Sequence, residues 1–175
     1  MFDALTIVNY ALLVPLAALI TYYDARYRRI PNAFVLATLV AGLCVNTISG
    51  GWAGALASLG GLGSAFCLML LLHVFGAMGA GDVKLFAAVG SVVGTGLVPS
   101  TFLVVLLTGG VLAVYTILRN GTLVSTLIRV AQIFIGLLPG GQIPRFSIPA
   151  DRRHTIPYGV AITLGSLISL FVFRA

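Results

Sequence analysis

Six apolar runs account for most of this chain and limit what it can fold into. Connections that contain charged residues, glycine or proline separate them, and all but the last are short. A helix needs about twenty apolar residues to cross the hydrocarbon core of a bilayer, where its backbone groups must pair internally. The pattern therefore predicts an all-α polytopic membrane protein, a bundle of six transmembrane helices. The runs occupy residues 5–23, 33–48, 56–75, 82–98 (ended by Pro99), 101–118 and about 156–173.

Composition supports a membrane protein and argues against a separate soluble domain. Hydrophobic residues make up 59% of the 175 residues and charged residues only 8%, whereas soluble domains carry about 25% charged residues. We expect one membrane-embedded domain over residues 1–175. The first run lacks a basic start, so we do not interpret it as a removable signal peptide. Cys44 and Cys67 lie in apolar runs without metal-ligand spacing and are predicted to be small core residues.

The basic residues predict the orientation in the membrane. Nine of the ten Lys and Arg residues lie in or beside the connections that follow the first, third and fifth runs. The positive-inside rule places that side in the cytoplasm and both termini outside. Residues 122–138 contain Arg129 and Gln132, so we expect an amphipathic helix in the interface and not a seventh span. With the irregular loop that follows, it forms a cytoplasmic or interfacial segment over 119–155. The basic excess is read as a topology signal, and no nucleic-acid partner is predicted.

Two aspartates are the candidates for chemistry. The chain has four acids, Asp3, Asp24, Asp82 and Asp151, and no Glu. The predicted topology puts Asp24 and Asp82 at the cytoplasmic ends of two helices, at one membrane depth. Two close carboxylates cannot both ionise cheaply and therefore share a proton. One then accepts a proton from water while the other donates one to a carbonyl oxygen, which is the aspartic protease mechanism.

Other interpretations of these acids stay open. Asp24 alone fits a helix-end residue paired with a nearby Arg, and Asp82 alone fits a helix cap. Together they also fit a proton-coupled carrier or a membrane assembly factor without enzymatic activity. The sequence has no His, Cys and Glu cluster with ligand spacing, so no metal and no cofactor is predicted.

Three motifs resemble those of a known family. Residues 79–85 read Gly-Ala-Gly-Asp-Val-Lys-Leu and resemble the GxGD signature of membrane aspartic proteases. Residues 24–32 read Asp-Ala-Arg-Tyr-Arg-Arg-Ile-Pro-Asn and resemble the first-aspartate motif of prepilin peptidases, the type IV leader peptidases. Residues 156–161 read Ile-Pro-Tyr-Gly-Val-Ala and resemble the element that opens the last helix of that family.

The resemblance implies an inner-membrane endopeptidase that removes the short basic leader of type IV pilin-like precursors. Its catalytic pair falls on Asp24 and Asp82, and the partners it implies are a prepilin or pseudopilin and the lipid bilayer. The chain lacks the cysteine-rich segment of longer members, so methyltransferase activity is not expected. The short form resembles peptidases of tight-adherence (Flp) pilus systems, although preflagellin peptidases and GxGD enzymes that cut within single spans stay alternatives. Supporting roles at the site are expected for Gly79, Gly81, Lys84, Pro157, Tyr158 and Gly159.

Overall fold

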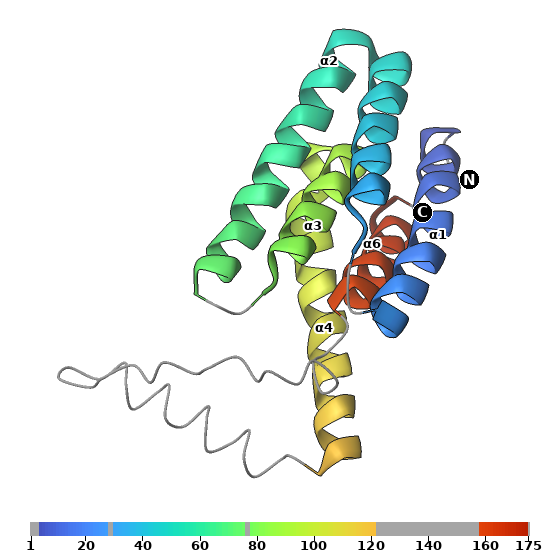
Figure 1. Ribbon diagram of the computed structural model, residues 1–175. Helices are drawn as coiled ribbons and strands as arrows, with labels where there is room; N and C mark the ends of the chain where they lie inside the picture. The colour runs from blue at the N-terminus through green and yellow to red at the C-terminus, as the bar shows by residue number, and fades with distance from the viewer. Residues whose placement is uncertain (1–3, 28–29, 76–77, 122–157, 175) are drawn as a thin grey trace, which may run out of the picture. The chain divides into compact units, whose positions relative to one another are not determined.

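The computed structural model describes residues 4–27, 30–75, 78–121 and 158–174, and most of these residues are helical (Figure 1). No strand occurs within these ranges, which confirms the all-α prediction. The elements are α1 (Ala4–Tyr27), α2 (Asn32–Val74), α3 (Ala80–Val93), the short 3-10 helix η1 (Thr95–Leu97), α4 (Val98–Asn120) and α6 (Tyr158–Arg174). In this part of the chain α1, α2 and α4 contain segments long and apolar enough to span a membrane, and α3 and α6 are shorter. The count of six spans stays a prediction.

The chain divides into two compact units, and the functional candidates all lie in the first. This unit comprises Met1–Gly109 and Pro157–Ala175, and the second comprises Gly110–Ile156. In the second unit the structure describes the last part of α4 and Gly121. The predicted interfacial helix at 122–138 and the loop up to 154 lie outside the described residues. The single domain over 1–175 therefore stays a prediction.

Helix α2 is a hairpin of two antiparallel limbs, residues 32–50 and 52–74 (Figure 1). Gly51 forms the turn with φ of 58° and ψ of −139°, a conformation that glycine adopts without a steric penalty. Pro31 precedes the helix in an extended conformation and fixes where it begins. The sequence predicted these limbs as the second and third runs. Cys44 and Cys67 lie on α2 as free, exposed residues, so their predicted core position is wrong. Both face away from the packed core. A small apolar thiol suits a surface that faces lipid.

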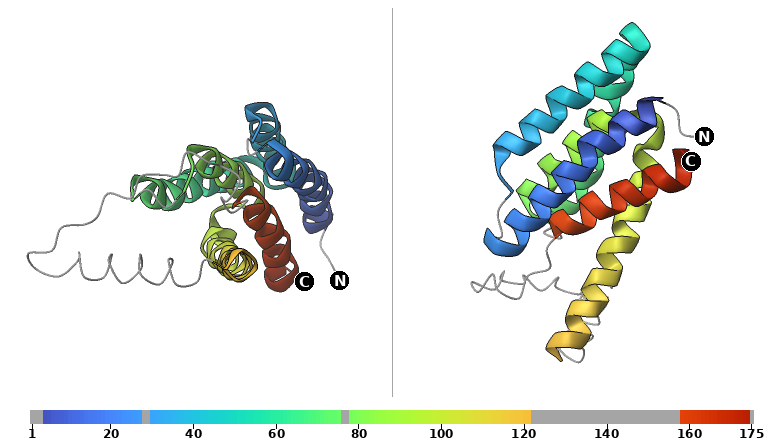
Figure 2. Two further views of the ribbon diagram at one scale, coloured as in Figure 1. Left: turned by 60° about the horizontal axis from the view of Figure 1, so that its bottom comes forward. Right: turned by 90° about the vertical axis from the view of Figure 1, so that its right-hand side faces the viewer.

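Helix α3 is the buried centre of the first unit and packs against α2, α6 and α1 (Figure 2). Every residue from Val83 to Gly94 except Lys84 is buried. The backbones of α2 and α3 approach most closely at Gly61 and Gly90. A Cβ atom at either glycine would overlap the carbonyl oxygen of the other. Small residues permit this close packing between helices in a membrane, where the hydrophobic effect between them is weak.

Three helix ends differ from the sequence prediction. Helix α1 continues through Asp24 to Tyr27, because neither proline nor glycine occurs between Asp24 and Pro31. Helix α3 begins at Ala80, so that Asp82 lies in its first turn, and it ends at Gly94. Gly94 has φ of 79° and ψ of 164°, a conformation that is essentially restricted to glycine. The prediction that Pro99 ends this helix is wrong, because Pro99 lies in the first turn of α4, where its missing N–H costs nothing.

Candidate active site

Asp24 is a buried carboxylate held by the backbone of a distant helix. It lies in the last turn of α1 and is only 8% exposed. Its Oδ2 accepts a hydrogen bond of 3.0 Å from the backbone N–H of Gly159, in the first turn of α6. The N–H groups in the first turn of a helix have no partner within that helix, so this donor is available to an acid. Helices α1 and α6 pack against each other and bring the two groups to one end of the unit.

The surroundings of Gly159 leave little space for a side chain. A Cβ atom there would lie 2.9 Å from Asp24 Oδ2 and 3.0 Å from Cγ2 of Ile20. It would also lie 3.3 Å from Cδ1 of Ile30. Any larger side chain would therefore push the carboxylate away from the N–H that it accepts.

Asp82 has a different, local partner. Its Oδ2 accepts a hydrogen bond of 3.3 Å from the N–H of Gly79, the residue that precedes α3. A side chain that reaches back to the first free amide of its own helix is the acidic half of a capping box. Asp82 is half-buried and Gly79 is exposed. The Asp82 carboxyl thus lies nearer to the surface than that of Asp24.

The two acids are close enough to influence each other electrostatically. Burial, and next the negative charge of Asp24, raise the pKa of Asp82 to about 6, while the Gly79 N–H opposes the shift. Ile30 connects the surroundings of the two acids, because its side chain lies near both Gly159 and Gly81. The structure therefore brings Asp24 and Asp82, from different helices, to the same end of the first unit.

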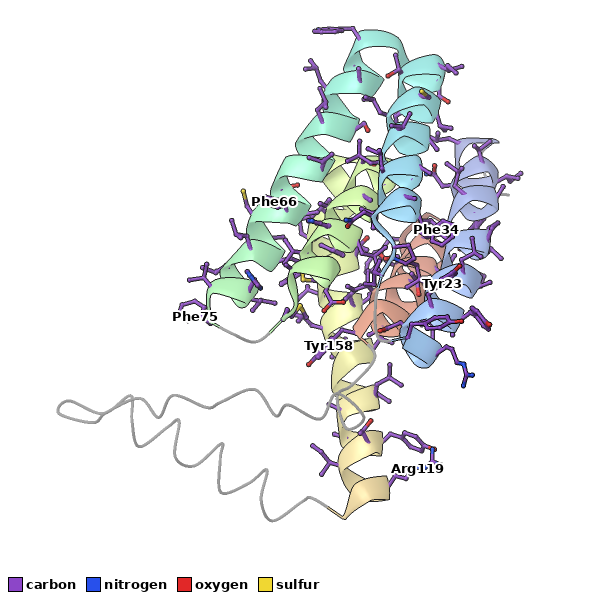
Figure 3. All side chains as sticks on the ribbon, in the orientation of Figure 1. Tyr23, Phe34, Phe66, Phe75, Arg119 and Tyr158 are labelled. Atoms are coloured by element: carbon purple, nitrogen blue, oxygen red, sulfur yellow. The ribbon has the colours of Figure 1, made fainter. Side chains whose placement is uncertain are left out.

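Aromatic side chains hold the end of α1 against the start of α2. The rings of Tyr23 and Phe34 meet edge to face with centroids 5.4 Å apart (Figure 3). Tyr23 also packs beside Tyr27, at 5.6 Å. This contact fixes the last turn of α1, which carries Asp24.

The other predicted site residues have different positions. Gly79 and Gly81 lie at the start of α3, next to Asp82. The Tyr158 ring packs over Gly109 of α4, where a Cβ atom would lie 3.3 Å from the ring (Figure 3 labels Tyr158). Lys84 is exposed, and Pro157 lies outside the described residues. Their supporting roles stay predictions.

Two residues that the sequence analysis did not select also shape this end. Ile30 fills the space between Gly81 and Gly159, and its only signal was its place in the Ile-Pro-Asn part of the first motif. His73 lies 2.7 Å from the carbonyl oxygen of Met78 through its Nδ1 and so links the end of α2 to the segment before α3. A single His in an apolar run gave no sign of this contact.

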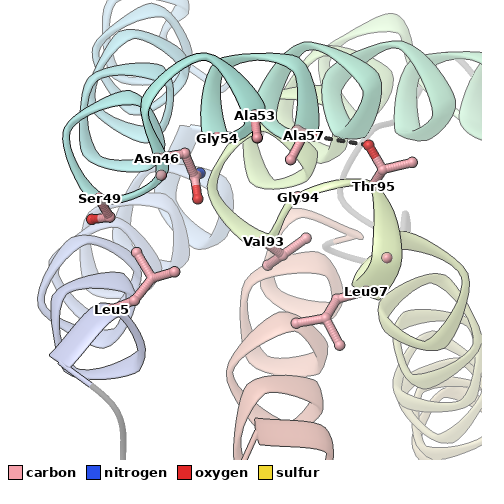
Figure 4. Close-up of a pocket in the computed structure, with 12 residues that line it drawn as sticks. Leu5, Asn46, Ser49, Ala53, Gly54, Ala57, Val93, Gly94, Thr95 and Leu97 are labelled. Carbon is pink, nitrogen blue, oxygen red and sulfur yellow. Dashed lines mark hydrogen bonds between the residues drawn. The ribbon is translucent and has the colours of Figure 1, made fainter.

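A cavity of about 320 Å³ lies at the other end of the unit (Figure 4). Leu5, Asn46, Gly94 and Thr95 are among its lining residues, and Thr95 donates a hydrogen bond of 2.9 Å to the carbonyl of Ala57. Leu5 and Asp24 are at opposite ends of α1, so this cavity is not the site of the two acids. In the described ranges no group of three or more His, Cys, Asp or Glu side chains is arranged to hold a metal ion.

Comparison with known families identifies the chain. The model of the type IV leader peptidase family matches residues 11–114, which is more than half of the chain. The chain belongs to this family. The match includes both Asp24 and Asp82, and it ends before α6. No curated protein and no solved structure was found to match. Membership of the type IV leader peptidase family indicates a protease, and the long apolar helices indicate a membrane protein.

Proposed function

We propose that this type IV leader peptidase is an aspartic endopeptidase that cleaves the short basic leader from prepilin-like precursors. Flp-type pilins are the proposed substrate class, and preflagellins are the alternative. The observation that carries the proposal is the pair of acids, since Asp24 of α1 and Asp82 of α3 interact at one end of the packed unit. Family membership supports the reaction type.

The pair has the parts that peptide hydrolysis needs. One carboxylate accepts a proton from water, and the resulting hydroxide attacks the carbonyl carbon of the scissile bond. The protonated partner donates its proton to the carbonyl oxygen, giving a neutral tetrahedral intermediate. The acid that took the proton from water then donates it to the leaving nitrogen, while a hydroxyl of the intermediate gives its proton to the other carboxylate. The C–N bond then breaks, and the pair is ready for another water.

The site is proposed to lie at the cytoplasmic face of the inner membrane, with both termini outside. Arg26 in the last turn of α1 and Lys84 near the start of α3 are exposed at the end that holds the acids. Basic residues are enriched on the cytoplasmic side of membrane proteins. A leader that ends at that face would present its scissile bond at the level of Asp24 and Asp82.

Leader processing tests the proposal directly. A pilin precursor with a basic leader is co-expressed with the wild type, Asp24→Asn or Asp82→Asn, and the new N-terminus is quantified. Each substitution removes a group that must change its proton during the reaction, so we expect cleavage to fall by about 10³-fold or more. Asp3→Asn is the matched control, because Asp3 precedes the first span and is predicted on the opposite face. Normal processing by either site variant would refute the assignment.

The same experiment separates the alternatives. A proton-coupled carrier or an assembly factor would produce no new N-terminus on the pilin. A protease that cuts within single spans would produce an N-terminus inside the apolar helix of the substrate. Exchange of the pilin for a preflagellin distinguishes the two precursor classes.

A further inference from the structure

The two acids differ in what holds them, and this difference bears on their roles. Asp24 accepts its hydrogen bond from another helix, at 3.0 Å, in a buried position. Asp82 accepts a longer one, at 3.3 Å, from the exposed N-cap of its own helix. A hydrogen bond to a charged acceptor is stronger where water is excluded. The Asp24 carboxylate therefore has the stronger and more rigid support.

Asp24 also needs this support more than Asp82 does. Asp24 lies at the C-terminal end of α1, where the helix dipole disfavours a negative charge. The start of α6 carries the opposite partial charge and points its Gly159 N–H at Asp24. Asp82 already lies at the favourable end of its own helix. The contact with α6 thus offsets a local penalty that only one of the two acids has.

We propose that Gly159 is a positioning residue that holds Asp24 as the ionised carboxylate that accepts a proton from water. Asp82 is then the member of the pair that carries the shared proton and gives it to the carbonyl oxygen. This assignment rests on the proposed peptidase function. It agrees with the raised pKa of Asp82, which burial and the charge of Asp24 cause.

The pH dependence of cleavage separates these roles. Among the described residues, the titratable and charged groups at this end come from four helices, and Arg26 and Lys84 are exposed. The others include Asp24, Tyr23 and Tyr27 of α1, His73 of α2, Asp82 of α3 and Tyr158 of α6. Activity needs one proton on the pair. In this assignment, the loss of activity at low pH reports protonation of Asp24. The loss of activity at higher pH reports deprotonation of Asp82.

Gly159→Ala tests the contact in the full-length protein. The added Cβ would lie 2.9 Å from Asp24 Oδ2 and would move the carboxylate off the N–H. We expect the acidic limb of the kcat profile to move upward by about one pH unit and kcat at the optimum to fall about tenfold or more. KM should change less than about twofold, and the alkaline limb should stay in place. A shift of the alkaline limb alone would show that Asp24 holds the proton and would overturn the assignment.

Gly165→Ala is the matched control on the same helix. Its Cβ would lie 2.8 Å from Cα of Val105, a similar overlap on α6 but away from both acids. We expect less folded protein and an unchanged pH profile. A profile that changes as much in Gly165→Ala as in Gly159→Ala would show that general packing, not the N–H, sets the roles.

A second variant decides the question even if Gly159→Ala does not fold. Replacing the amide of residue 159 by an ester, through cell-free incorporation of glycolic acid, removes the N–H and adds no side chain. The same rise of the acidic limb supports the proposal, and an unchanged profile overturns it. If the wild-type protein did not cleave the precursor, or if Asp24→Asn cleaved it at the full rate, the peptidase function itself would be refuted.

Discussion

The two ends of the first unit use polar groups in opposite ways. Near the α2 turn the buried polar side chains are neutral hydrogen-bond donors. Asn46 Nδ2 donates to the carbonyls of Ser91 and Val92, at 2.9 and 3.1 Å, and the Ser58 hydroxyl donates to that of Ser91 at 2.7 Å. These bonds join both limbs of α2 to the C-terminal part of α3.

At the other end the polar groups are carboxyl acceptors, which carry one negative charge between them in the proposed mechanism. Asp24 and Asp82 accept from the backbone N–H groups of Gly159 and Gly79, at the starts of α6 and α3. Donors at the neutral end meet carbonyls in the last turn of α3, which have no partner within that helix. The acids instead meet the unpaired amides of helix starts.

Under the proposed function, the first end serves stability and the second serves the reaction. Neutral hydroxyl and amide groups next to carbonyls gain modest energy and change no proton near neutral pH. Two acids that affect each other share a proton. Removal of this last proton leaves two negative charges close together, which raises the energy of the folded state. Variants at the first end should therefore change stability and leave the chemistry intact, and variants at the second should do the reverse.

The largest effect on stability is expected at the close contact of Gly61 and Gly90. Gly90→Ala would overlap the carbonyl oxygen of Gly61 and the side chain of Ala65, so α2 and α3 must separate. We expect a loss of about 3 kcal/mol in the free energy of unfolding, measured by steric trapping in bicelles. Gly63→Ala is the control, since no atom lies within 4 Å of its added Cβ. Equal stability of the two variants would contradict the tight packing of α2 against α3 at this contact.

A smaller effect is expected at Asn46, and it sharpens the comparison. Asn46→Ala removes the donor shared by the carbonyls of Gly42, Ser91 and Val92. We expect about 1–2 kcal/mol less stability, in line with hydrogen bonds between membrane helices, and unchanged cleavage per folded molecule. Thr47→Ala is the control, because Thr47 is exposed and bonds only to Leu43 of its own helix. A defect in cleavage with normal stability would break the division between the two ends.

The smallest effect is a pH dependence of stability at the acidic end. The pKa of Asp82 is raised from 3.8 to about 6 by burial and by the charge of Asp24. Between these values the folded state binds more protons than the unfolded state, so the free energy of unfolding falls as pH rises from about 4 to about 6. The expected decrease is on the order of 1 kcal/mol after allowance for solvent screening. Unfolding scans across this range should show it in the wild type and not in Asp82→Asn, and a rise with pH would contradict it.

The sequence predicted the helices better than their ends. Long apolar runs with few charges predict helices from the bilayer alone, and the runs at 33–48 and 56–75 correspond to the two limbs of α2. The end at Pro99 was wrong because proline suits the first turn of a helix as well as a position after it. The cysteines were misplaced because an apolar run in a membrane protein does not show which face contacts lipid.

The candidate site was predictable in part. The residues beside the two acids repeat the motifs of a family, so Asp24 and Asp82 could be selected from the chain alone. Gly159 was selected only as part of a motif, and its N–H contact with Asp24 was not foreseen. Backbone donors have no sequence signature, because every residue except proline carries the same N–H group.

By itself, the sequence determined that this protein consists of apolar helices, that its acids are few, and which two acids stand in family motifs. These properties depend on residue type and spacing along one chain. Only the tertiary structure decided that the start of α6 supplies the donor to Asp24, that Ile30 reaches both Gly81 and Gly159, and that Gly61 and Gly90 meet. Such contacts join segments far apart in the sequence, and they depend on which helix faces pack together.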